Sequence, residues 1–293
     1  MNRKYVLMIL PIMLLASCGN SKDSSSSDKL TIYTSFYPIY DFATRIAKDK
    51  ANVINITPAG SEPHDYSPTT REVLGMEDAD LILVNGLGLE NWTDSLPDSF
   101  SSKVINVTDG IETENINGTV DPHVWLNPLN AIKDMENITA SLISIDNSNS
   151  DYYKSNLSDA TYLFTSLDDS FKETTAAFTN KHIVVSHAAF GYLCNHYGLE
   201  QIYVDGISPD DEPTAKALEE VIANVKEYNI TTIFSEELVS SEIAESIARK
   251  TGCSVETLNP LEGLSEDELP YEDYVSVMVN NMQKLKAACE EKA

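Results

Sequence analysis

Short runs of β-branched and aliphatic residues alternate with amphipathic helical patterns along almost the whole chain. In the first half, the runs that predict strands lie at 30–35, 53–58, 81–85 and 103–108. In the second half they lie at 182–186, 201–206, 231–236 and 254–258. The helical patterns between and after them lie near 38–49, 69–80, 89–96, 188–197, 213–229, 240–251 and 271–289. Strands that alternate with helices form parallel sheets with helices on both faces. The sequence therefore predicts two similar α/β lobes of about four strands each.

A different pattern separates the two halves. Apolar residues from Tyr153 to Phe178 recur at spacings of three or four with one gap of seven, and no glycine or proline interrupts residues 150–178. This spacing predicts one long amphipathic helix that packs along both lobes as a stiff spine. A coiled-coil partner helix is the alternative. The expected domains are an N-terminal lobe at 30–140, a linking helix at 141–179 and a C-terminal lobe at 180–293.

The N-terminus has the features of a secretory signal. Arg3 and Lys4 precede an apolar run of eleven residues, from Tyr5 to Leu15, which is too short to span a membrane as a helix. The run ends in Leu-Ala-Ser-Cys, which resembles a bacterial lipobox and predicts a signal peptide at 1–17 and lipidation of Cys18. An ordinary signal followed by a chance cysteine is the alternative. The serine-rich residues 18–29 predict a flexible tether.

Charge and cysteine content limit the partners of the chain. The net charge of −26 repels nucleic acid and anionic lipid and attracts cations, although acidic surfaces also serve solubility alone. Cys194, Cys253 and Cys289 remain after Cys18, and their spacing matches no metal motif. A Cys253–Cys289 disulfide and free thiols both remain open.

Three of the five histidines lie where predicted strands end or beside prolines in loops. His64 is in the loop after 53–58, His187 follows 182–186 directly, and His123 lies between two prolines. The other two, His182 and His196, lie at the opposite ends of their elements. Carboxylates that also follow strands are Asp205, Glu236, Glu237 and Glu262. Ligands of open parallel sheets bind beyond the carboxyl ends of the strands, so these groups meet in a cleft if the two lobes face each other.

Five stretches, in this order, resemble the metal-specific substrate-binding lipoproteins of bacterial ABC importers: GSEPHDYSPT, ADLILVNGLGLENW, DPHVWLNP, SHAAFGYLCNHYGL and LNPLEGL. The resemblance covers residues 30 to 288, nearly all of the mature chain. It implies two α/β lobes joined by one long helix, with a metal ion between the lobes. The family's metal ligands fall on His64, His123, His187 and Glu262. Other acids near Glu262, or a water, are alternatives for the fourth ligand.

The implied ligand set favours zinc. Three imidazoles and one carboxylate suit tetrahedral Zn²⁺, whereas Mn²⁺ prefers more oxygen ligands and a higher coordination number. Histidine ligands usually donate their other ring N–H to a nearby acceptor, for which Asp121, Asp65 and Glu62 are candidates. The resemblance also places Glu237 near the cleft, where it would position His187 or the metal. Many zinc proteins of the family have a long histidine-rich loop before the second ligand; here that segment, TDGIETENINGTVDPH, is short, acidic and free of other histidines.

The resemblance implies a binding protein rather than an enzyme. We expect it to be a monomer outside the cytoplasm, anchored to the cell membrane only by its N-terminal lipid. There it would capture one Zn²⁺ per chain and deliver it to an ABC permease, without binding nucleic acid. A manganese or iron carrier of the same family is one alternative. A zinc hydrolase is the other, if water occupies the fourth ligand position, although no H-E-x-x-H stretch is present.

Overall fold

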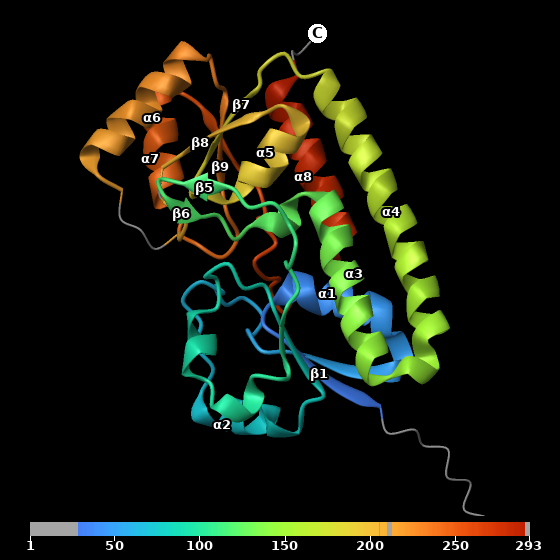
Figure 1. The fold of residues 1–293 in the computed structure, drawn as a ribbon. Helices are drawn as coiled ribbons and strands as arrows, with labels where there is room; N and C mark the ends of the chain where they lie inside the picture. The colour runs from blue at the N-terminus through green and yellow to red at the C-terminus, as the bar shows by residue number, and fades with distance from the viewer. Residues whose placement is uncertain (1–28, 205, 210–212, 291–293) are drawn as a thin grey trace, which may run out of the picture.

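The computed structural model describes residues 29–204, 206–209 and 213–290. Two four-stranded parallel sheets lie in separate halves of the molecule, each with helices packed against it (Figure 1). The predicted α/β fold with two similar lobes is therefore confirmed. The predicted signal peptide, Cys18 and the tether up to residue 28 lie outside the described residues.

The N-terminal sheet has the strand order β2-β1-β3-β4. Its strands are β1 (Leu30–Thr34), β2 (Ala51–Asn55), β3 (Leu81–Val84) and β4 (Val104–Asn106). β3 is buried at all its positions, which explains its uninterrupted apolar sequence, because a central parallel strand is covered on both faces. Between β1 and β2 runs α1 (Tyr37–Ala47), which buries Phe42 and Ile46. The short helix α2 (Thr70–Gly75) begins at the capping box that Thr69 and Glu72 predict.

The C-terminal sheet repeats this arrangement with the order β10-β9-β7-β8. Its strands are β7 (His182–Val185), β8 (Glu200–Tyr203), β9 (Thr232–Ser235) and β10 (Ser254–Thr257). The helices of this half are α5 (Gly191–Tyr197), α6 (Ala215–Glu227), α7 (Glu242–Thr251) and α8 (Tyr274–Cys289). All of these strands point the same way, so the loops that follow them gather at one edge of the sheet.

The long helix predicted between the halves is α4 (Ser150–Ala176), which runs antiparallel beside α3 (Pro128–Ile145) along one side of the molecule (Figure 1). Phe164 of α4 stacks on Tyr274 of α8 at 4.8 Å and meets the ring of Phe42 in α1 edge-on at 5.8 Å between centroids. The apolar stripe thus packs against both halves of its own chain. This packing contradicts the coiled-coil alternative, since the stripe is buried against α1 and α8 of its own chain.

A single apolar core extends through both halves. It includes Ile32 of β1, Phe164 of α4 and Val185 of β7. Polar contacts also cross between the halves: the Trp125 indole N–H donates to the Pro260 carbonyl at 2.8 Å. The Tyr274 hydroxyl donates to the Trp125 carbonyl at 2.6 Å. The two halves are therefore joined by buried packing as well as by the linking helix.

Two local predictions differ from the structure. The helical pattern at 89–96 forms a single 3₁₀ turn, Asn91–Ser95. The acidic segment before His123 forms a hairpin that was not predicted, with strands β5 (Asn115–Ile116) and β6 (Thr119–Val120). Asn117 and Gly118 at its turn have φ of 53° and 89°. An Asn-Gly pair with both φ positive is the usual two-residue hairpin turn, so this dipeptide was the available signal.

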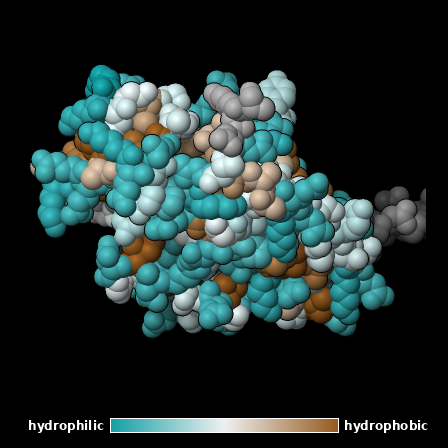
Figure 2. All heavy atoms as spheres, turned by 90° about the horizontal axis from the view of Figure 1, so that it is seen from above, coloured by the Kyte–Doolittle hydropathy of each residue, from teal (hydrophilic) through white to brown (hydrophobic). Residues whose placement is uncertain are grey.

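The thiols and the surface complete the description. Cys194, Cys253 and Cys289 are free, so the Cys253–Cys289 bond is not formed. Within the part of the chain that the structure describes, none of the helices has both the length and the apolar character needed to cross a membrane. The face seen in Figure 2 is largely hydrophilic, with hydrophobic residues in small separate groups.

Candidate metal centre

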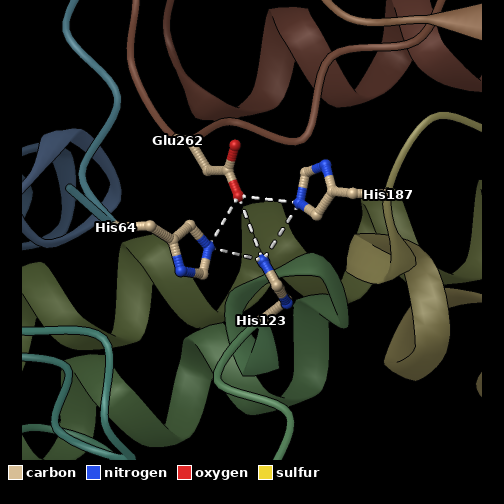
Figure 3. Close-up of side chains that lie close together, drawn as sticks. All are labelled: His64, His123, His187 and Glu262. Carbon is tan, nitrogen blue, oxygen red and sulfur yellow. Dashed lines mark hydrogen bonds and ion pairs between the residues drawn. The ribbon is translucent and has the colours of Figure 1, made fainter. Parts of the chain in front are cut away.

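Four side chains from distant parts of the sequence converge between the two halves (Figure 3). His64 lies in the loop after β2, and His123 lies between β6 and a 3₁₀ turn at Val124–Leu126. His187 follows β7 directly, and Glu262 lies in the loop after β10. The candidate residues are thus brought together as predicted. His182 and His196 lie elsewhere: His182 stacks on Tyr228 at 3.8 Å, and Nε2 of His196 lies 2.7 Å from Asp168.

Five of the six distances between the donor atoms are close to the edges of a small tetrahedron, and all six are within 4.8 Å. Oε1 of Glu262 lies 3.0 Å from Nε2 of His123, 3.2 Å from that of His187 and 3.3 Å from that of His64. Nε2 of His123 lies 3.1 Å from Nε2 of His64 and 3.4 Å from Nε2 of His187. Tetrahedral zinc with bonds of ~2.0–2.1 Å requires ligand atoms ~3.3–3.4 Å apart. The four donors therefore surround a space of the size that one zinc ion occupies.

The site is buried and charged. His123, His187 and Glu262 are almost fully buried, and His64 is the most exposed of the four, with 9% of its side chain accessible. Burial opposes ionisation of Glu262, but the charge of His187 and hydrogen bonds from the imidazoles hold its pKa well below the usual range. Burial likewise opposes protonation of His187, but the carboxylates of Glu262 and Glu236 raise its pKa well above the usual range. A protonated His187 therefore supplies positive charge beside Glu262, as a bound cation would.

Two buried carboxylates lie behind two of the imidazoles. Oδ1 of Asp121 accepts the backbone N–H of His123 at 3.0 Å and lies 2.7 Å from its Nδ1. Oε2 of Glu236 lies 2.7 Å from Nδ1 of His187, and its Oε1 accepts the backbone N–H of His187 at 3.2 Å. When Nδ1 holds the proton beside a carboxylate, the lone pair of Nε2 points to the centre of the site.

The supporting acids only partly follow the sequence analysis. Asp121 lies where it was expected, but the acid beside His187 is Glu236, the residue before the expected Glu237. Glu237 is exposed, and the role expected for it stays a prediction. Burial and a hydrophobic strand end distinguish Glu236, since it directly continues the buried residues of β9. Oε1 of Glu62 accepts the backbone N–H of His64 at 3.0 Å. Burial and the nearby Glu262 raise the pKa of Glu62 to about 9.

The NGLGLE stretch after β3 holds the segment that contains His123. The buried carboxylate of Glu90 accepts the backbone N–H groups of Asn85 at 2.7 Å and Gly86 at 2.8 Å. The Asn85 side chain then donates to the carbonyl of Pro122 at 3.0 Å, one residue before His123. Leu87 has a positive φ of 57°, which shows how tightly this loop turns. No role was predicted for this stretch, and in the structure it supports the site.

A surface cavity reaches the site at His64. Its volume is 440 Å³, and its lining includes His64, Asn117 at the hairpin turn and Gly206 after β8. The cavity therefore lies between segments from both halves of the molecule. Among the four donors, only His64 contributes to its lining.

The comparisons with known proteins agree with this geometry. The family described as "Zinc-uptake complex component A periplasmic" matches residues 32–288. The chain is 36% identical to the high-affinity zinc uptake system protein ZnuA of Bacillus subtilis, over 94% of this chain and 93% of that protein. It is 34% identical to the zinc-binding lipoprotein AdcA of Streptococcus pneumoniae, over 98% of this chain but only 60% of that protein. This chain therefore spans less than two thirds of AdcA.

Solved structures give the same picture. The Zn(II)-bound ZnuA-like domain of Streptococcus pneumoniae AdcA matches with a TM-score of 0.80 and 36% identity. The match covers 90% of this chain and 100% of that domain. The metal-dependent lipoprotein YcdH of Bacillus subtilis matches with a TM-score of 0.79 and 37% identity, over 89% of this chain and 99% of that chain.

Proposed function

Because the chain belongs to the zinc-uptake complex component A family, we propose that it captures one Zn²⁺ outside the cytoplasm and delivers it to an ABC-type permease. The proposed ligands are His64, His123, His187 and Glu262. The observation that carries the proposal is the convergence of these four donors, all within 4.8 Å of one another, at a largely buried position between the halves. Relatives that are named for zinc uptake or zinc binding support the choice of cargo.

The donor set favours zinc over manganese. Three of its four donors are imidazole nitrogens, and only Glu262 provides oxygen. Zn²⁺ accepts this nitrogen-rich, four-coordinate set, whereas Mn²⁺ favours carboxylate, carbonyl and water ligands in octahedral geometry. The close spacing of the donors also leaves little room for additional ligands.

The same contacts argue against a hydrolase. A catalytic zinc keeps one coordination position open for water or substrate. Oε1 of Glu262 lies within 3.3 Å of all three imidazole Nε2 atoms, so it fills the fourth corner of the tetrahedron. A closed site that binds tightly and releases its ion whole suits a carrier.

The N-terminal features complete the proposal. The Leu-Ala-Ser-Cys stretch supports lipidation of Cys18, which would hold the protein at the outer surface of the cell membrane through residues 18–29. The folded part would then act as a monomer beside the permease. The acidic surface raises the local concentration of cations near the site.

Metal analysis of the purified protein tests the proposed ligands. We expect one zinc per chain in the wild type and none retained by His187→Ala after the same chelator wash. His182→Ala is the matched control, since this histidine stacks on Tyr228 outside the site. Full zinc retention by His187→Ala, or loss of zinc from His182→Ala to the same degree, would contradict the assignment.

A further inference from the structure

A glycine begins α5, where its backbone conformation does not require one. Gly191 has φ −55° and ψ −55°, which are ordinary helical values. Alanine stabilises a helix by about 1 kcal/mol relative to glycine at an interior position. A reason other than backbone conformation must therefore account for glycine here, and close approach of another group is the usual one.

The group that approaches Gly191 is the side chain of Asp121. A Cβ atom at position 191 would lie 2.8 Å from Oδ2 of Asp121 and 3.2 Å from Nε2 of Gln201. Real Cβ atoms essentially never come within 3.0 Å of another heavy atom, so one of the two residues would have to move. Asp121 is fully buried in the segment before His123, and Gly191 is buried in the C-terminal half.

Asp121 has little freedom to move. Its Oδ1 is the atom that lies 2.7 Å from Nδ1 of His123, so rotating the carboxylate away from position 191 would change that contact. Its backbone is held as well: the carbonyl of Asp121 accepts the hydroxyl of Tyr192 at 2.9 Å, and its N–H donates to the carbonyl of Glu114 at 2.9 Å. A methyl group at 191 would therefore be accommodated at the expense of the Asp121–His123 contact.

The same helix fixes the hairpin segment to the C-terminal half. The Tyr192 hydroxyl accepts the backbone N–H of Glu114 at 2.9 Å, and the Asn195 amide donates to the Glu114 carboxylate at 2.6 Å. In Figure 1 the β5–β6 hairpin lies against the half that contains α5, although it belongs to the first half of the sequence. His187 lies four residues before Gly191, so α5 and the turn before it join His187 to the segment that leads to His123.

We propose that Gly191 is a positioning residue of the metal site. Its missing side chain leaves room for the Asp121 carboxylate to orient His123, and α5 thereby sets the distance between His123 and His187. This inference rests on the proposed function, because it concerns the geometry of the proposed zinc ligands. None of the three atoms nearest to a Cβ at position 191 belongs to a proposed ligand, so Gly191 would act through Asp121.

A double-mutant cycle tests the inference. Zinc affinity is measured by competition with a chromophoric chelator for the wild type, Gly191→Ala, Asp121→Ala and the double variant. We expect Gly191→Ala to bind zinc ~10–100-fold more weakly, the usual cost of losing a contact that orients a metal ligand. In the Asp121→Ala background the same substitution should have no further effect, because the carboxylate is gone. Gly75→Ala is the matched control: it lies in α2, and its Cβ would meet only the Tyr33 hydroxyl at 3.4 Å.

Each outcome separates the inference from the proposed function. Wild-type affinity in Gly191→Ala, or an equal loss in both backgrounds, would overturn the role of Gly191 while leaving zinc binding intact. Wild-type protein that takes up no zinc would overturn the proposed function and this inference with it. If Gly191→Ala does not fold, a folded double variant supports a clash with Asp121. A double variant that also fails to fold places the clash elsewhere and overturns the inference.

Discussion

Replacing Glu262 by glutamine removes the one negative charge of the proposed ligand set without changing its shape. Glu262 is almost fully buried, and three imidazole nitrogens lie within 3.3 Å of its Oε1. An amide oxygen is a neutral and weaker ligand for Zn²⁺ than a carboxylate. The substitution also removes the negative charge beside His187, so the stability of the zinc-free variant differs from that of the zinc-free wild type even before zinc is added. Each protein is therefore compared with its own zinc-free form.

The size of the zinc effect follows from mass action. At free zinc 1,000 times the dissociation constant, binding stabilises the native state by about 4.1 kcal/mol. An unfolding entropy of ~2.1 cal/mol/K per residue gives roughly 0.55 kcal/mol/K for about 260 residues, so the melting temperature rises by about 7 °C. Losing a direct ligand should weaken binding at least ~100-fold, the upper end of the cost of losing an outer contact. The remaining stabilisation is then about 1.4 kcal/mol, or about 2.5 °C.

Differential scanning calorimetry at one fixed free zinc concentration measures both shifts. Glu219→Gln serves as the control, because Glu219 is an exposed residue of α6 and the substitution removes the same charge. We expect the control to keep the full zinc-dependent rise. A rise in Glu262→Gln equal to that of the wild type would show that the carboxylate is not a ligand, and a neighbouring acid or water would then take the fourth position.

Three further predictions use other parts of the structure. His187→Glu exchanges a nitrogen donor for oxygen, so the ratio of manganese to zinc affinity should rise, and an unchanged ratio in competition titrations would remove the main argument for zinc. Because the pKa of His187 is raised, zinc must displace a proton from this imidazole. The zinc affinity should therefore increase with pH by up to about tenfold per pH unit, until the pH passes that pKa. Zinc titrations at several pH values that show no such dependence would contradict this. Phe164→Ala should lower the free energy of unfolding, measured in urea, by about 3–5 kcal/mol, because the Phe164 ring contacts helices of each half. Both halves should still unfold in one transition. Two separate transitions in the wild type would contradict the shared core.

Periodicity predicted the fold well because the sheets are parallel and buried. A strand such as Leu81–Val84, covered on both faces, is apolar throughout, and its short length distinguishes it from a buried helix. One exception, the pattern at 89–96, lies where Glu90 turns inward to hold Asn85 and Gly86. There a buried polar contact overrides local helix propensity, which sequence periodicity cannot detect.

The four converging side chains were predictable, but most of their supports were not. Three histidines at comparable strand ends suggested convergence, and the family resemblance selected them together with Glu262. The choice between Glu236 and Glu237 depends on which carboxylate the end of β9 directs inward, and one residue changes that direction. The role proposed for Gly191 depends on its closeness to Asp121, which lies seventy positions earlier and in the other half. A local sequence pattern cannot predict such a contact.

Asp121 and Glu236 explain how a site that is buried can also hold the charge of a metal ion. A dication bound by three neutral imidazoles and one carboxylate has a net positive charge, which is costly to bury without further compensation. The carboxylates of Asp121 and Glu236 lie 2.7 Å from the Nδ1 atoms of His123 and His187, on the side of each ring that faces away from the site. There they offset the charge without filling coordination positions, and each favours the tautomer whose Nε2 can bind metal. Had the same two acids been inside the donor shell, the set would hold as many carboxylates as imidazoles, which is closer to what manganese favours. With the proposed ligands, selectivity for zinc would therefore depend as much on keeping these carboxylates outside the donor shell as on bringing the histidines together.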